Sequence, residues 1–434
     1  MDSVLVAVIG LLILFTLIAL RMPIGYAMGT VGFVGAGVII GFKSGASLLG
    51  ISPFHSAMSY FLAVVPLFVL MGSLATLSGV SRDGYNVTFK WLGHLPGGLA
   101  VATIGGCAGF AAVCGSSTAS AVTMGKVALG AMKAYNYKPQ LSMGSIAAGG
   151  TLGVLIPPSM GFVIYGIITE QSIGRLFLAG IIPGIILTGL FMLTVYILAR
   201  RDPTLGPPGA RTPWPERLKS LKDAWGVALM FFIVMGGIWG GLFTPTEAAA
   251  VGVIIALFIV VIRRQFSVRK VADCLMDTVR TTGMLMVIVI GALIYNYFLA
   301  LSGLPRVLAA FITDLTIPAL GVLAVILVIY FFLGCVMEVL SMVMLTLPIF
   351  FPTVVALGYD PIWFGVIVIL MNEMAMITPP VGLNVYALAG INPDVPMETI
   401  FKGAAPFTLA LAAAVIINIM FPQIALLLPN TMIG

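Results

Sequence analysis

Residues 148–159 read AGGTLGVLIPPS, and residues 372–384 read NEMAMITPPVGLN. Both stretches end an apolar segment with two consecutive prolines. Two prolines in succession remove two backbone donors and prevent a helix from continuing. We therefore expect a helix that stops and restarts at each stretch. Each interruption leaves unpaired carbonyl groups at one half-helix end and unpaired amide groups at the other.

The two stretches belong to a wider internal repeat. At an offset of 222 positions, Tyr137 aligns with Tyr359 and five prolines of the first half align with prolines of the second. The prolines are Pro23, Pro96, Pro139, Pro157 and Pro158, matching Pro245, Pro318, Pro361, Pro379 and Pro380. At an offset of 224, Leu77-Ser78-Gly79 and Arg82 match Leu301-Ser302-Gly303 and Arg306. Duplicated halves with apolar segments broken by Gly and Pro are typical of secondary transporters.

The composition places this repeat in a lipid bilayer. Hydrophobic residues make up 60% of the 434 positions, charged residues only 8%, and the mean hydropathy is +1.16. The net charge of +6 does not indicate nucleic-acid binding, because the basic residues lie in short loops between apolar runs. The predicted spans are 4–20, 24–41, 60–78, a pair within 98–133, 140–171, 176–199, 224–242, 246–262, 283–301, a pair within 318–356, 362–390 and 400–428.

The Gly-rich pairs within 98–133 and 318–356 are predicted to be re-entrant helical hairpins. Their tips lie near 114–118 (the first tip) and 336–341 (the second tip). Backbone can break at membrane depth only where protein or a wet cavity covers it. The ranges 140–171 and 362–390 are the two broken helices, and the short mixed segments 47–57, 82–95, 266–278 and 305–316 are predicted to be interfacial helices.

The basic residues orient the chain. If the Arg/Lys-rich linker 200–223 lies in the cytoplasm, all Lys and Arg except Lys43, Arg175 and Arg306 fall on that side. This is a strong positive-inside bias. Both termini are then outside, and repeat 1 (1–199) and repeat 2 (224–434) have opposite orientations. The sequence thus predicts an all-α polytopic membrane protein with an inverted repeat.

The two tips and the two breaks are expected to meet near the bilayer midplane. Free carbonyl groups and Ser/Thr hydroxyls are hard oxygen ligands of the kind that hold Na⁺, and helix N-termini suit a carboxylate. The predicted sodium ligands are Ser116, Ser117, Thr118, Gly149, Gly150, Gly153, Pro157, Glu338, Ser341, Asn372, Ala375 and Thr378. The predicted substrate contacts are Ser116, Ser117, Pro158, Ser159, Glu338, Pro380, Gly382 and Asn384. No cofactor and no transition metal are expected.

Three acidic residues admit more than one interpretation. Glu338 matches Ser116 in the repeat, and an acid at membrane depth is functional by default. It can favour a cation, carry a proton or form a structural hydrogen bond across the tip. Glu373 matches Thr151 and is a weaker candidate of the same kind, or ties the broken helix to its neighbour. Thr244-Pro245-Thr246-Glu247 is better explained as a capping box. For the Gly/Ser-rich stretches, close helix packing is the alternative to a binding site.

At these residues the chain resembles the large membrane subunit of TRAP (tripartite ATP-independent periplasmic) transporters, over essentially its whole length. The most specific segments are Gly115-Ser116-Ser117, residues 150–159, Phe243-Thr244-Pro245-Thr246-Glu247-Ala248 and residues 377–384. Two positions depart from the family pattern. Glu338 stands where the family usually has Asp, and Ala375 stands where a Gly is common.

The resemblance implies a function that spacing alone cannot show. Such subunits import organic acids through the bacterial inner membrane, driven by sodium, with the hairpins and broken helices moving as an elevator domain against a scaffold. A periplasmic binding protein (P type) delivers the substrate, and a small four-helix membrane subunit (Q type) braces the large one. Both partners are expected to be separate chains. The carboxylate or sulfonate that is carried stays open.

Two other classes of protein are alternatives. A membrane-embedded hydrolase needs a nucleophile with a base at membrane depth, whereas the two histidines, His55 and His94, lie in predicted interfacial segments. Ser116 and Ser117 have only Lys126 as a weak candidate for such a base. A channel can also contain an inverted repeat, but paired hairpins facing broken helices favour alternating access.

Overall fold

The computed structural model describes residues 2–314 and 318–432, and within these ranges every regular element is a helix. Seven of the described helices are long and apolar enough to cross a membrane, or eight if the bent pair α11 (Trp214–Leu221) and α12 (Trp225–Trp239) counts as one span. Five further apolar helices have 10–17 residues. These lengths agree with the predicted all-α polytopic membrane protein.

The first half of the chain contains ten α-helices within the described residues. Over the predicted hairpin 98–133 the chain forms two helices separated by two residues, and over 140–171 it forms two helices separated by four. The bounds are α1 Ser3–Ala19, α2 Ile24–Ile40, α3 Phe42–Met58, α4 Val64–Ser78, α5 Val80–Leu92, α6 Gly98–Cys114, α7 Ser117–Ala134, α8 Pro139–Leu155, α9 Met160–Thr169 and α10 Ile173–Arg201.

The second half places the same kinds of helix pair over 318–356 and 362–390. The bounds are α13 Pro245–Ile262, α14 Val268–Ser302, α15 Leu304–Asp314, α16 Ala319–Gly334, α17 Val339–Ala356, α18 Pro361–Ala375, α19 Leu383–Ile391, α20 Met397–Met420 and α21 Gln423–Leu426. The re-entrant geometry, the inverted orientation and the division at 199 and 224 stay predictions.

Two predicted boundaries are wrong. Residues 266–278 are not a separate interfacial helix, because most of them form the start of α14, which continues unbroken to Ser302. Charged residues in 269–280 interrupt the apolar run, but no Pro lies in the segment to stop the helix. The predicted span 400–428 ends earlier, at Met420, because Phe421 leaves helical geometry and Pro422 follows. The end of the predicted segment 305–316 lies outside the described residues.

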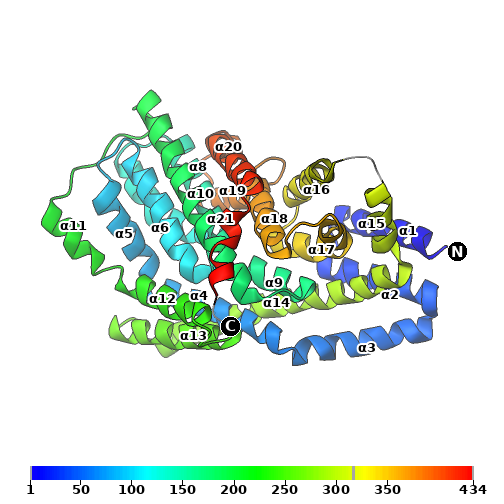
Figure 1. Ribbon diagram of the computed structural model, residues 1–434. Helices are drawn as coiled ribbons and strands as arrows, with labels where there is room; N and C mark the ends of the chain where they lie inside the picture. The colour runs from blue at the N-terminus through cyan, green and yellow to red at the C-terminus, as the bar shows by residue number, and fades with distance from the viewer. Residues whose placement is uncertain (1, 315–317, 433–434) are drawn as a thin grey trace.

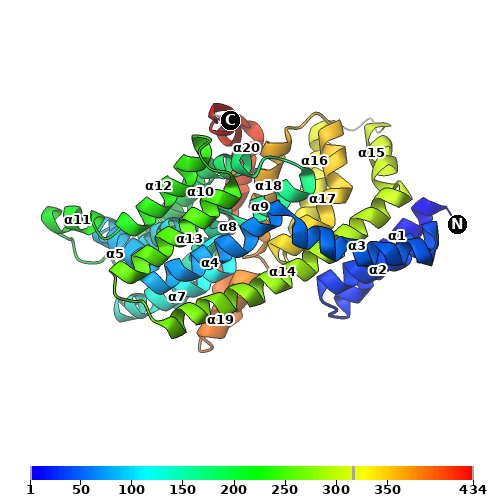
Figure 2. The same cartoon turned by 90° about the horizontal axis from the view of Figure 1, so that it is seen from below.

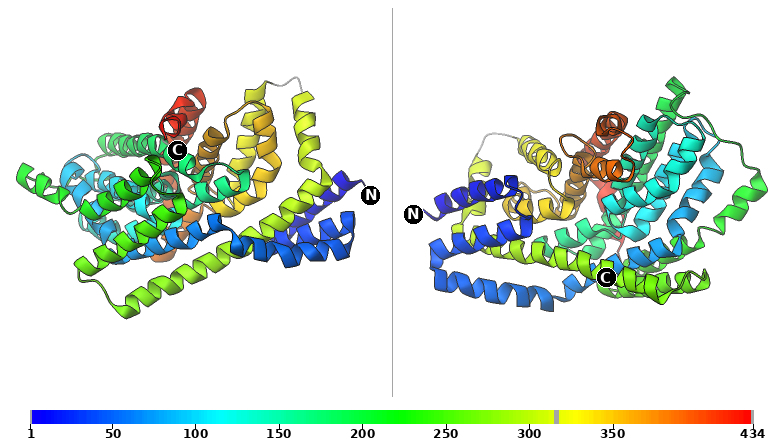
Figure 3. Two further views of the ribbon diagram at one scale, coloured as in Figure 1. Left: turned by 60° about the horizontal axis from the view of Figure 1, so that its bottom comes forward. Right: turned by 180° about the vertical axis from the view of Figure 1, so that it is seen from behind.

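α8 is the buried central helix of the part of the molecule outside α1, α2 and α3. Every residue from Leu141 to Leu155 is buried, and α6, α10 and α20 surround the helix (Figures 1 and 3). The crossing of α8 and α20 depends on two glycines, because a Cβ added to Gly144 would overlap the carbonyl group of Gly403. The small residues of α8 thus allow close helix packing, which was the alternative interpretation of such stretches.

α14 runs along one long edge of the molecule and packs at one end against the bundle formed by α1, α2 and α3 (Figure 2). It packs closely on α2, because a Cβ on Gly291 would overlap the Gly25 carbonyl oxygen. α14 and α4 also pack against each other. These two helices form a continuous wall against which the hairpin tips are placed.

The linker between the halves is folded onto the first half. Trp91 Nε1 donates a hydrogen bond to the Arg217 carbonyl at 3.2 Å, and the Arg217 guanidinium lies over the Trp214 ring at 5.2 Å. Arg217 also approaches His94 Nδ1 at 3.4 Å. Burial, followed by the Arg217 charge, lowers the pKa of His94. His94 therefore takes part in a structural contact.

Candidate functional site

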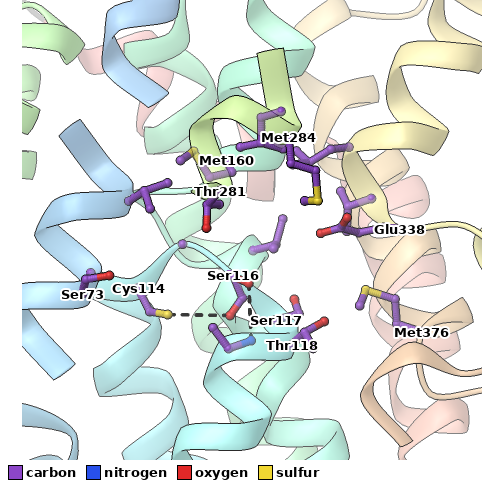
Figure 4. Close-up of a pocket in the computed structure, with 18 of the residues that line it drawn as sticks. Ser73, Cys114, Ser116, Ser117, Thr118, Met160, Thr281, Met284, Glu338 and Met376 are labelled. Atoms are coloured by element: carbon purple, nitrogen blue, oxygen red, sulfur yellow. Dashed lines mark hydrogen bonds between the residues drawn. The ribbon is translucent and has the colours of Figure 1, made fainter. Parts of the chain in front are cut away.

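A cavity of about 260 Å³ lies where the two tips face α4 and α14 (Figure 4). The first tip lines it with residues 114–119, and the second with residues 338–340. The opposite wall is made by Val69, Gly72, Ser73 and Thr76 of α4 and by Thr281, Met284 and Leu285 of α14, with Val154, Met160 and Met376 completing the lining. The site therefore lies between the hairpins and the wall helices.

The first tip is a two-residue turn locked onto the first break. Gly115 has φ +69°, a left-handed conformation that glycine adopts without steric cost. The Ser116 hydroxyl then accepts a hydrogen bond from Ala119 N at 3.4 Å and caps α7. The Met160 amide donates to the Gly115 carbonyl at 3.4 Å. The hydroxyls of Ser116 and Thr118 are thereby held at the cavity wall.

Ser117 connects the first tip to both broken helices. Its Oγ lies 2.8 Å from each carboxylate oxygen of Glu373 and 3.5 Å from the Thr151 carbonyl oxygen. A hydroxyl has one proton, so Ser117 donates it to the Glu373 carboxylate. Glu373 is fully buried and Ser117 is 2% exposed. Thr151 and Glu373 occupy matching positions of the repeat, and the structure brings both to this one hydroxyl.

The first break spans residues 156–159, and the second spans 376–382. Both Pro-Pro bonds are cis. At the first break Ser159 is buried, and its hydroxyl accepts from Phe162 N at 3.3 Å as the cap of α9. At the second break the Thr378 hydroxyl donates to the Met374 carbonyl at 2.7 Å. Both predicted ligand hydroxyls are thus engaged with their own local backbone.

Asn384 ties the second broken helix to the first half. Its Nδ2 donates to the Ala147 carbonyl at 3.2 Å, and Thr118 Oγ1 lies 3.5 Å from its Oδ1. Asn384 is fully buried and does not line the cavity. Its side chain joins α7, α8 and α19, so the two hairpin-and-break units are bonded to each other.

The second tip brings the only acidic side chain among the described cavity-lining residues. Glu338 is half-buried and projects into the cavity, opposite Thr281 and Ser116 (Figure 4). Behind this tip, a Cβ on Gly334 would lie 3.1 Å from Asn372 Oδ1. Asn372 is fully buried, and within the described part of the chain neither polar atom of its side chain has a hydrogen-bond partner.

The structure divides the predicted ligands into two groups. Ser116, Ser117, Thr118 and Glu338 line the cavity. The others do not line it: Gly149, Gly150, Gly153, Pro157, Pro158, Ser159, Ser341, Asn372, Ala375, Thr378, Pro380, Gly382 and Asn384. Gly149, Gly150 and Gly153 have a packing role, since a Cβ on each would come within 2.5–2.7 Å of α6, the first tip or α7.

Sequence reasoning did not select the wall residues Ser73, Thr76, Thr281 and Met284. Ser73 and Thr76 lie in an apolar helix with no acid beside them, and Thr281 and Met284 directly follow the charged stretch 269–280 of α14. One feature of the sequence could have pointed to Thr76: it directly precedes the repeated motif Leu77-Ser78-Gly79. The capping box at Thr244 and Glu247 is confirmed, since the Thr244 side chain accepts from Glu247 N and the Glu247 carboxylate accepts from Thr244 N.

Comparisons with known proteins point in one direction. Residues 11–424 match the model of a family described as "Tripartite ATP-independent periplasmic transporter, DctM component". The chain is 35% identical over 384 residues to a C4-dicarboxylate TRAP transporter large permease protein, DctM, of Pseudomonas aeruginosa, covering 88% of this chain and 89% of the relative. It is 32% identical over 414 residues to a sialic acid TRAP transporter large permease protein, SiaM, of Vibrio cholerae, covering 95% and 96%.

A similar fold occurs in a solved structure, the YdaH transporter of Alcanivorax borkumensis. The two folds superpose with a TM-score of 0.58 over 89% of this chain and 88% of the other, at 16% sequence identity. This likeness concerns the arrangement of helices alone.

Proposed function

Because the chain belongs to the family of DctM components of tripartite ATP-independent periplasmic transporters, we propose that it is the large permease of a sodium-coupled importer of an organic anion. The family consists of transporter permeases, not enzymes, and its members carry various organic acids. They work with a substrate-binding protein and a small permease component. For this chain we propose two separate partners, a P-type periplasmic binding protein and a Q-type four-helix membrane subunit. We further propose that the chain itself lies in the bacterial inner membrane, with both of its termini in the periplasm.

The observation that carries the proposal is the central cavity between the two tips. It combines hydroxyls and a helix N-terminus at the first tip with a carboxylate at the second. The N-terminus of α7 provides free amide groups for the acidic group of a carboxylate or sulfonate substrate. Hydroxyls from the wall helices provide further hydrogen bonds.

Sodium coupling has support in the buried acid next to this cavity. Glu373 is fully buried, and no Lys or Arg forms an ion pair with it among the described side chains. An ionised carboxylate in such surroundings needs a compensating cation. The free amide oxygen of Asn372, the carbonyl groups of the second break and the Ser117 hydroxyl offer the additional oxygen ligands.

An elevator movement is supported by the hydrogen bonds that join the two halves. Ser117–Glu373 and Asn384–Ala147 join the hairpin-and-break units of the two halves to each other. The opposite wall of the cavity, α4 and α14, presents mostly apolar side chains and hydroxyls to the tips. We propose that α6–α9 and α16–α19 move as one body along this wall. A hydrolase lacks comparable support, because the partner of the Ser117 hydroxyl is a carboxylate and not a histidine.

The test is reconstitution of the complete three-component system in liposomes, with the binding proteins loaded in turn with radiolabelled succinate, sialic acid and other organic acids. We expect uptake of at least one of them that requires the binding protein and an inward sodium gradient. Uptake that persists without sodium would remove the coupling. Absence of uptake for every organic acid that the binding protein retains would overturn the function.

A further inference from the structure

Two cavities at opposite ends of α14 are built around the same turn. In the first, α4 ends at Ser78, whose hydroxyl donates to the Ala75 carbonyl at 2.7 Å, and Gly79 follows with φ +80°. In the second, α14 ends at Ser302, whose hydroxyl donates to the Leu299 carbonyl at 2.7 Å, and Gly303 follows with φ +71°. Three residues after each glycine comes an arginine, Arg82 or Arg306.

Each turn lines a cavity, and we name the two cavities after their helices. The α4 mouth, about 530 Å³, contains residues of 76–83, Thr123 and Lys126 of α7, and Arg263. The α14 mouth, about 690 Å³, is lined by residues of 296–306, by Ser3 of α1, and by Pro348 and Pro352 of α17. Lys126 and Pro348 are matched by the same offset of 222 that aligns the prolines. Both mouths therefore combine the end of a wall helix with a hairpin helix.

Both mouths have excess positive charge. In the α4 mouth Asp83 forms an ion pair with Arg263, so the charges of Arg82 and Lys126 are left in excess. In the α14 mouth Arg306 is the only charged residue in the described lining. Arg82, Lys126 and Arg306 are exposed, and none of them forms an ion pair with the side chains that the structure describes. A cavity lined by one sign of charge concentrates ions of the other sign.

The α4 mouth adjoins the central cavity, and the α14 mouth lies farther along one of the wall helices. Thr76 lines both the α4 mouth and the central cavity, and α7 lines the central cavity with Thr118 and the mouth with Thr123 and Lys126. The middle of α14, at Thr281, borders the central cavity, whereas its end borders the α14 mouth. Thr281 and Leu299 are 18 residues apart on α14, which corresponds to about 27 Å at the usual helical rise.

We propose that the α4 and α14 mouths are vestibules for the transported anion, in which Arg82 and Arg306 hold its carboxylate or sulfonate group transiently on either side of the central cavity. This inference rests on the proposed function, which supplies the anion and its passage from one mouth to the other. An anionic lipid headgroup has a phosphate of the same charge, so the experiment has to separate the two sources.

A pair of matched cysteine substitutions tests the charge of the mouths without any transport. Thr76 and Ala300 are equivalent in the repeat, both are exposed, and each lies six residues before its arginine. Thr76→Cys and Ala300→Cys are introduced in the full complex in phosphatidylcholine liposomes. Their reaction rates with an anionic reagent, 2-sulfonatoethyl methanethiosulfonate, and a cationic one, 2-trimethylammonioethyl methanethiosulfonate, are then compared. The parent chain, with its four native cysteines, gives the background.

The anion-to-cation rate ratio is expressed relative to that of a free small thiol, because a thiolate itself attracts the cationic reagent. We expect this relative ratio to exceed one at both introduced thiols. Arg82→Gln should lower the anion-to-cation rate ratio by roughly 3- to 10-fold in the Thr76→Cys variant only, because one partly screened charge acts over about a Debye length. Arg306→Gln should lower the ratio in the Ala300→Cys variant only. Arg82→Lys should retain the ratio. A ratio near one, or a ratio that ignores the arginines, would overturn the proposal whether or not the complex transports anything.

Two additional measurements separate substrate from lipid. If the anion is the occupant, Arg306→Gln raises the KM of uptake with little change in the maximal rate. Added phosphatidylglycerol, whose surface charge attracts the cationic reagent at any exposed site, then lowers the rate ratios equally with and without the arginine. The alternative result is that phosphatidylglycerol slows the reaction of the Thr76→Cys thiol with both reagents, and that this protection is lost when Arg82→Gln is added. In that case a lipid occupies the mouth and the proposal is wrong.

Discussion

The two halves place different chemistry at equivalent positions. In the first half, Ser116 uses its hydroxyl to cap its own helix, and Thr151 donates to the Ala148 carbonyl at 2.6 Å within its own helix. In the second half the same positions are Glu338 and Glu373. Glu338 makes no side-chain capping bond and projects into the cavity, and Glu373 reaches across to Ser117.

This difference gives the two halves different roles: the first fixes the geometry of the site, and the second provides its negative charge. At these two positions the first half satisfies its hydroxyls within its own helices, which keeps the tip and the break in fixed geometry. The second half directs two carboxylates out of their own helices, toward the cavity and toward the first half. Under the proposed sodium coupling, the second half therefore has the residues whose removal should alter the response to sodium most, because an acid in apolar surroundings is costly unless a cation compensates it.

The largest effect is expected for Glu373→Gln. The amide keeps the shape and can still accept from Ser117, but the negative charge is lost. A charge-assisted contact is worth about 1.5–3 kcal/mol, so the affinity for sodium should fall by roughly 10- to 100-fold. The measurement is the initial rate of uptake as a function of sodium concentration in proteoliposomes.

Thr151→Val is the matched control in the first half. It removes a hydroxyl that bonds only within its own helix, so sodium dependence should stay close to that of the parent. Equal sodium dependence of Glu373→Gln and the parent would contradict the division of roles between the halves.

The second effect in size concerns the tips. Glu338→Gln removes the only acid in the described lining of the cavity, and uptake should fall by roughly tenfold, as for loss of one partly solvated charged hydrogen bond. Ser116→Ala, at the matching position, should act through stability instead, costing about 1 kcal/mol of helix capping. Uptake at saturating sodium, together with thermal unfolding in detergent, distinguishes the two. A Ser116→Ala variant that unfolds like the parent but has lost sodium activation would reverse the assignment.

The third prediction compares Gly153 with Ala375, which are equivalent at the offset of 222. A Cβ on Gly153 would lie 2.5 Å from the Ser116 carbonyl oxygen, which is backbone and cannot move aside. Gly153→Ala should therefore destabilise the protein by about 1–3 kcal/mol through overpacking. Ala375 has its methyl group already, and the space for it comes from Gly334, where a Cβ would lie 2.8 Å from Ala375 Cβ.

Ala375→Gly is accordingly the control, and it should cost only about 1 kcal/mol of helix propensity. Thermal unfolding of the two variants in the same detergent measures the difference. If Gly153→Ala were as stable as the parent, the first tip would not be locked on the first break as described.

The sequence was sufficient for the parts of the fold that Pro and Gly determine. The interruptions that follow Leu155 and Ala375 were predicted from the Pro-Pro pairs, because two successive prolines remove two backbone donors. The continuity of α14 was missed because charges in 269–280 indicate depth in a membrane and not the end of a helix. The contact between Ser117 and Glu373 was also out of reach, because it depends on the relative rotation of helices separated by 256 residues.

The smallest effect concerns how α8 and α18 begin, again at matched positions. Asp360 caps α18 directly, accepting from Ile362 N at 2.8 Å and from Trp363 N at 3.0 Å, so Asp360→Ala should cost about 1 kcal/mol. The match of Asp360 in the first half is Lys138, which makes no capping bond and pairs instead with Asp202 of the linker at 3.4 Å.

The Asp202 side chain is 45% exposed, so Asp202→Asn should destabilise less than Asp360→Ala, and the loss should depend on pH. Hydrogen bonds from the Thr204 hydroxyl and amide, and to a smaller extent the contact with Lys138, lower the pKa of Asp202 below its usual range. A carboxylate with a lowered pKa in the folded state stabilises the fold above its unfolded pKa, near 4, and this contribution disappears as the pH falls through the folded value. The parent and Asp202→Asn should therefore differ in thermal unfolding at neutral pH and converge in acid. A difference that stays constant down to acid pH would show that the contacts of Asp202 do not depend on its charge.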